Sequence, residues 1–232
     1  MIRPAAFALL LTAGLAAPQP ATAQRIGDSR APSATGARAS PAPARAESRR
    51  PTFGAHQASQ DVRRLADWIA ASGDNRDMPF LVVDKREAKV FLFNTRSEIL
   101  AAAPALLGAA FGDDSAEGIG KRRLSAIPVE ERTTPAGRFE AALGRDLEQD
   151  VLWIDYGIAL SLHRVITGGP KERRRERLAS TTAGDNRVSY GCINVPASFY
   201  DGAVSPAFAG TVGIVYILPE TRLLETVFAI GG

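Results

Sequence analysis

The sequence predicts a mainly β domain, built as a mixed sandwich or barrel with a few short helices. Short runs of β-branched and aromatic residues recur between turn-rich segments, as in all-β proteins. The chain shows no regular alternation of strands and helices, which argues against a nucleotide-binding α/β sheet. It has one cysteine in 232 residues, so a packed core has to stabilise the fold in place of disulfides.

The amino terminus has the features of an export signal. Residues 1–23 combine one arginine, an apolar run and small residues before Gln24. The apolar run is shorter than the roughly 20 residues that a membrane span needs, and no later stretch reaches that length. We therefore expect a signal peptide at 1–23, no integral membrane segment after cleavage, and a periplasmic or secreted protein.

The next two segments differ in composition. Residues 24–58 are rich in Ala, Pro, Ser and Arg and have few bulky apolar residues, which predicts a disordered tether. Residues 59–76 predict a helix, because Ser59 is a suitable N-cap, Val62, Leu65 and Ile69 follow at helical spacing, and Gly73 can end it. We expect the β domain at 78–220 and a C-terminal tail at 221–232.

The strands of the β domain are expected in a simple order along the chain. "FLVVD" and "KVFLFN" predict a hairpin, and 98–114 predicts an extended segment because Pro104 and Gly108 would break a helix. Further strands are predicted at 138–143, at 150–156, at 158–165 and at 211–218.

The charge pattern excludes one class of partner and leaves another open. The net charge is +3, but acidic and basic residues are mixed along the chain, so we expect no binding to nucleic acid. The exception is a basic segment at 169–180, which contains "PKERRRERL". It is either a solvated, partly self-compensated helix or a basic lid that attracts carboxylate-rich substrates.

Candidate chemistry centres on "VSYGCINVP" at 188–196, which contains Cys192. A cysteine nucleophile works as a thiolate and needs a neighbouring base, and His163 ends a predicted strand, whereas His56 lies in the tether. Gly191 permits a tight turn that can aim backbone N–H groups at one point. A buried cysteine that serves only as a small apolar side chain is the alternative.

Three motifs in order, "TTPAGRF" (133–139), "IALSLH" (158–163) and "SYGCIN" (189–194), resemble the L,D-transpeptidase catalytic domain, also called the YkuD domain. The resemblance covers about Phe80 to Pro219. It implies the L,D-transpeptidase fold, with Cys192 as the nucleophile and His163 as the base, held by the backbone carbonyl of Arg164. It implies that 134–137 forms a structural turn.

The resemblance also implies a substrate and a binding site. The substrate would be a peptidoglycan stem peptide, either cross-linked between third residues or trimmed when water is the acceptor. We expect no cofactor and no metal, because one cysteine, one well-placed histidine and no clustered carboxylates fall short of a zinc site. The backbone N–H groups of Tyr190, Gly191 and Cys192 would bind the oxyanion. Side chains expected to contact the substrate are Ser189, Tyr190, Asn194 and Trp153, although the tryptophan also fits a core position.

The chain departs from the family pattern at two places. Tyr190 stands where the family usually has a second histidine, and the 25 residues between His163 and Ser189 make a longer connection than usual. Two other classes remain open: a sortase-like transpeptidase, whose Thr-Leu-x-Thr strand before the cysteine is missing here, and a wall-binding protein that has the fold without turnover.

Overall fold

The structure, a computed structural model, describes residues 50–146, 149–166, 169 and 171–230. The predicted signal peptide and most of the predicted tether lie outside these residues. The strands are β1 (Phe80–Asp84), β2 (Lys89–Phe93), β3 (Ile99–Pro104), β4 (Leu107–Gly108), β5 (Gly137–Asp146), β6 (Gln149–Asp155), β7 (Leu160–Arg164), β8 (Arg187–Ser189), β9 (Ile193–Val195) and β10 (Val212–Ile217).

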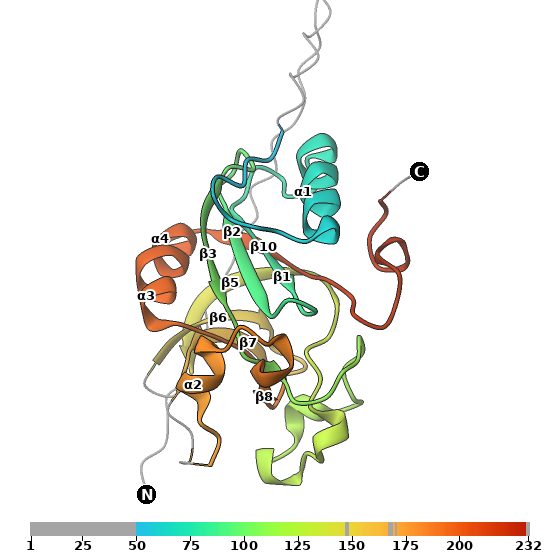
Figure 1. Cartoon of the computed structure of the whole chain (residues 1–232), viewed down its shortest axis with the longest axis vertical. Helices are drawn as coiled ribbons and strands as arrows, with labels where there is room; N and C mark the ends of the chain where they lie inside the picture. The colour runs from blue at the N-terminus through green and yellow to red at the C-terminus, as the bar shows by residue number, and fades with distance from the viewer. Residues whose placement is uncertain (1–49, 147–148, 167–168, 170, 231–232) are drawn as a thin grey trace, which may run out of the picture. The chain divides into compact units, whose positions relative to one another are not determined.

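The described chain is mainly β, as the sequence predicts (Figure 1). One mixed sheet has the order β3-β2-β1-β10-β5-β6-β7-β9, and β4 pairs with β8 in a second, small sheet. Strand β1 is parallel to β10, and β7 is parallel to β9. Two backbone hydrogen bonds of 2.8 and 2.9 Å join Leu106 to Asn194 of β9, so the large sheet nearly closes into a barrel.

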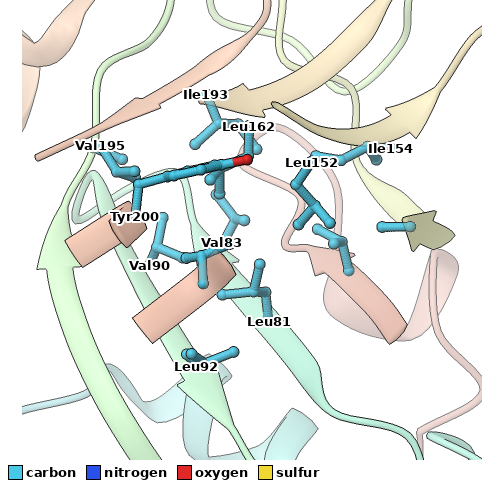
Figure 2. Close-up of a cluster of buried hydrophobic side chains, with 14 of the residues drawn as sticks. Leu81, Val83, Val90, Leu92, Leu152, Ile154, Leu162, Ile193, Val195 and Tyr200 are labelled. Atoms are coloured by element: carbon cyan, nitrogen blue, oxygen red, sulfur yellow. The ribbon is translucent and has the colours of Figure 1, made fainter. Parts of the chain in front are cut away.

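The inside of this curved sheet holds the larger hydrophobic cluster. Because side chains alternate along a strand, every second residue points inward. Figure 2 shows the Tyr200 ring in this cluster, together with side chains of β1, β2, β6, β7 and β9. The cluster is closed by α3 (Ala197–Phe199), a π-helical turn (Tyr200–Val204) and α4 (Ser205–Phe208), which contribute Phe199, Tyr200 and Phe208.

The outer face of β1, β2 and β10 holds the second cluster, and α1 (Gln60–Ser72) packs on it (Figure 1). The Ser59 hydroxyl accepts the Val62 N–H at 3.3 Å, and Gly73 ends the helix in the left-handed region. The predicted helix and both of its predicted caps are therefore confirmed, although the helix ends at Ser72, before the predicted boundary at 76.

The second cluster extends past the boundaries drawn from the sequence. Phe53, placed in the predicted tether, is buried there, as are Leu224 and Phe228 of the predicted tail. Phe53 is isolated in a polar segment and carries no periodic signal, whereas Leu224, Val227 and Phe228 stand at helical spacing, a signal that the sequence reasoning missed. No helix within the described ranges is both long and apolar enough to cross a membrane.

Candidate active site

The parallel pairing of β7 and β9 brings the candidate catalytic segments together. His163 lies directly beside Asn194 in the register, as Leu162 does beside Ile193. Leu162 and Ile193 point into the core, so His163 and Asn194 point outward. Ser161 precedes His163 by two positions and Cys192 precedes Asn194 by two, so these four residues gather on the outer side of the sheet.

His163 is oriented by its own strand. Its Nδ1 lies 2.7 Å from the carbonyl oxygen of Arg164, as the resemblance implies. A carbonyl oxygen can only accept, so Nδ1 carries the proton of the neutral ring and the lone pair is on Nε2. Burial lowers the pKa of His163 below its usual value, the bond to Arg164 opposes this, and the nearby positive charge of Arg174 lowers it further. The imidazole is thus held in its basic form.

The Cys192 thiol is half-buried and contacts β7 and the turn before it. Its Sγ accepts a hydrogen bond from the Ser161 hydroxyl at 3.6 Å and donates to the Ala159 carbonyl at 3.4 Å. Nε2 of His163 faces the Asn194 amide nitrogen at 3.5 Å. Within the described residues no hydrogen bond joins the thiol to the imidazole, so proton transfer requires a side-chain rotation or a bridging water.

Ser161 is a site residue that the sequence reasoning missed. The signal was available, because Ser161 and His163 are alternate residues of a predicted strand and therefore share a face.

The turn before Cys192 corrects two expectations. Gly191 has φ of 128°, and a Cβ there would lie 2.7 Å from the Thr133 carbonyl oxygen, so glycine is required. The buried Ser189 hydroxyl accepts the Gly191 N–H at 3.1 Å and donates to the Cys192 carbonyl at 2.7 Å. Ser189 therefore holds the turn instead of facing a substrate, and the Gly191 N–H is already used. The N–H groups of Tyr190 and Cys192 have no acceptor in the described part of the chain.

Asn194 is also used internally. It is 1% exposed; its Oδ1 accepts from Arg174 at 2.9 Å and its Nδ2 donates to the Cys192 carbonyl at 3.3 Å. We expected this side chain to contact the substrate. Instead it joins the turn, the imidazole and the basic segment.

Tyr190 and Trp153 both lie near the site, in different surroundings. The Arg132 guanidinium lies 4.0 Å from the centre of the Tyr190 ring, a cation–π contact. Tyr190 also lines a cavity of about 20 Å³ beside Cys192, which has room for about one water molecule. Trp153 pairs with Ser161 across β6 and β7 and stacks on Tyr156 at 4.6 Å, so it lies on the outer face and not in the core.

The basic segment packs against this face. Its helix, α2 (Arg174–Ala179), begins with Arg174, whose side chain is 12% exposed, whereas Arg173 and Arg175 are exposed. The segment is therefore more than a solvated helix, because one of its arginines reaches the candidate base through Asn194.

No model of a known protein family matches this chain, and no curated protein matches it. Across the described residues, no group of three or more His, Cys, Asp or Glu side chains is arranged to hold a metal ion. The fold and site together define a barrel-like β domain with a cysteine, a serine, a histidine and an asparagine on one face of adjacent parallel strands.

Proposed function

We propose that this chain is an exported cysteine acyltransferase of the L,D-transpeptidase type, with that catalytic fold, acting on peptidoglycan stem peptides. The observation that carries the proposal is the pairing of β7 with β9, which sets His163 beside the Cys192 turn. The Nε2 atom of His163 carries no proton there and can act as a base. The sequence motifs add the substrate class by resemblance. The barrel-like sheet and the glycine-dependent turn are compatible with it.

In the proposed reaction, His163 Nε2 takes the thiol proton and the Cys192 thiolate attacks the carbonyl carbon of the third stem residue. The backbone N–H groups of Tyr190 and Cys192 stabilise the oxyanion. The C–N bond to D-alanine then breaks, and His163 returns the proton to the leaving amine. A thioester on Cys192 remains.

The second half of the reaction resolves the thioester. The amine of another stem peptide would give a cross-link between third residues, and water would give a trimmed stem. In either case His163 accepts the proton of the attacking group, which restores the thiol when the C–S bond breaks.

The test is mass spectrometry of the mature protein incubated with purified tetrapeptide muropeptides. We expect loss of D-alanine and a cross-linked or trimmed product from the parent, and none from Cys192→Ala. We also expect a carbapenem to acylate Cys192, with the rate falling by about 10²-fold or more in His163→Ala because the general base is lost.

His56→Ala is the matched control for the base, since His56 is the other histidine of the chain and lies in a different segment. Equal acylation of His163→Ala and His56→Ala would contradict the assigned base. A folded parent that forms neither adduct nor product would refute the enzyme and favour the wall-binding alternative.

A further inference from the structure

Arg174 occupies an unusual position for a residue of a basic surface segment. Its side chain is nearly buried, its Nε donates to Glu172 at 2.6 Å, and its Nη1 donates to Asn194 Oδ1 at 2.9 Å. The neighbouring Arg175 on the same helix is exposed. The two arginines therefore have different roles although they are adjacent in the sequence.

The contact with Arg174 is one of three contacts that fix how the Asn194 amide is turned. With Oδ1 on the guanidinium, Nδ2 points to the Cys192 carbonyl and to His163 Nε2. The flipped amide would place its NH₂ against the guanidinium and its oxygen against the Cys192 carbonyl and the Nε2 lone pair. All three contacts would be repulsive, since donor would meet donor and acceptor would meet acceptor.

We propose that Arg174 is a positioning residue for the candidate base: through Asn194 it keeps a hydrogen-bond donor, and not an acceptor, in front of His163 Nε2. A donor there favours the neutral imidazole with its lone pair on Nε2, which is the form a general base needs. An oxygen there would favour the protonated, inactive ring. The role of His163 as a base rests on the proposed function, whereas the contacts of Arg174, Asn194 and His163 are independent of that function.

The other charges around His163 set the sign of the expected effect. The positive charge of Arg174 disfavours the protonated ring and the negative charge of Asp146 favours it. The Arg164 guanidinium is turned away to Asp150 and Asp201, and the Cys192 thiol lies on the same face as His163. Removing Arg174 therefore takes away a cation and one of the three contacts that hold the amide in its present orientation, and both changes raise the pKa of His163.

The experiment is an NMR titration of the ¹⁵N-labelled imidazole in a His56→Gln background, which leaves His163 as the single histidine. We expect Arg174→Gln to raise the His163 midpoint by about 0.5–1 pH unit. Arg175→Gln, the same charge change one residue away, should give less than half that shift. Arg174→Lys keeps the charge but loses the fork that joins Glu172 to Asn194, so it should shift the midpoint in the same direction and serves if Arg174→Gln does not fold.

A double-mutant cycle separates action through Asn194 from a simple charge effect. In an Asn194→Ala background, Arg174→Gln should shift the midpoint by at most half as much as in the parent. A full shift in that background, or no shift from Arg174→Gln or Arg174→Lys, would overturn the proposal. An unchanged midpoint with a raised KM for stem peptide would overturn it as well, because Arg174 would then be a substrate contact.

The same variants report on the reaction separately. We expect the acid limb of the pH profile of carbapenem acylation to move toward neutral pH with the midpoint in Arg174→Gln. A parent that is never acylated would refute the proposed function, while the titration would still decide the role of Arg174.

Discussion

The Thr134 hydroxyl is a single group on which the geometry of the Cys192 turn depends. It accepts the Gly108 N–H at 2.9 Å and donates to the Gly191 carbonyl at 2.8 Å, and the residue is fully buried. It thus joins β4 to the turn with both of its hydrogen-bonding functions. The family resemblance implied a structural turn at 134–137; the backbone there is irregular and forms no turn, and the buried hydroxyl supplies the physical reason for the threonine.

Replacing Thr134 by valine keeps the shape and removes both bonds. We expect Thr134→Val to lower the free energy of unfolding by about 2–4 kcal/mol, because two buried backbone groups lose their partners. Carbapenem acylation should also slow, since the turn loses its support. Thr134→Ser keeps the hydroxyl and should recover most of both losses. Chemical denaturation and acylation rates check this, and a valine variant that behaves like the serine variant would contradict it.

At the level of elements, a buried charge network connects three segments behind the site. Lys85 is the residue after β1. Its ammonium group donates to Asp113 at 2.7 Å and to the Thr134 carbonyl at 2.9 Å. Asp113 in turn accepts the N–H groups of Glu220 and Thr221, beyond β10, at 2.8 and 2.9 Å. The network therefore fixes the loop after β4 against the ends of β1 and β10. It also holds the Thr134 backbone through the bond from Lys85.

Asp113 makes the stability of this network depend on pH. Burial alone would raise the pKa of Asp113, but the hydrogen bonds from Lys85, from Thr221 and from the backbone outweigh it and hold that pKa well below its usual range. The folded protein therefore releases this proton more readily than the unfolded chain, whose Asp has a pKa of about 3.9. The stabilisation is fully present above that value and is lost as the pH falls through the folded pKa.

We expect Asp113→Asn to cost about 2–3 kcal/mol at pH 7, because it removes the closer of the two carboxylates that pair with the buried Lys85 and leaves only Glu220, at 3.5 Å. Its unfolding free energy should also fall less steeply than that of the parent below about pH 4. Asp114→Asn is the matched control, since its side chain is 82% exposed and pairs with Arg222 at the surface, where such pairs contribute about 1 kcal/mol or less. Identical acid dependence of the parent and Asp113→Asn in urea titrations would contradict the assignment.

At the level of the whole molecule, local signals predicted the local structure. The caps Ser59 and Gly73, the hairpin of β1 and β2, and the apolar strands β6, β7 and β10 were all readable from neighbouring residues. The parallel pairing of β7 with the three-residue β9 was not, because so short a strand has no periodicity and its partner lies 31 positions away. The contact of Arg174 with Asn194 depends on that same long-range packing. The charge composition of the segment therefore predicted a basic surface but not this contact.

The chain after β10 closes the fold, and two adjacent leucines test this. Leu224 is 4% exposed and packs in the cluster under α1, whereas Leu223 is 72% exposed. We expect Leu224→Ala to lower the free energy of unfolding by about 2–4 kcal/mol through lost burial and the cavity left behind. Leu223→Ala should change it by about 0.5 kcal/mol or less. Denaturation of both variants decides whether the domain ends at Glu220, as its strand pattern suggested, or continues through Phe228. Equal effects of the two substitutions would mean that the segment after β10 is a tail. A loss of stability confined to Leu224→Ala would show that this segment belongs to the core.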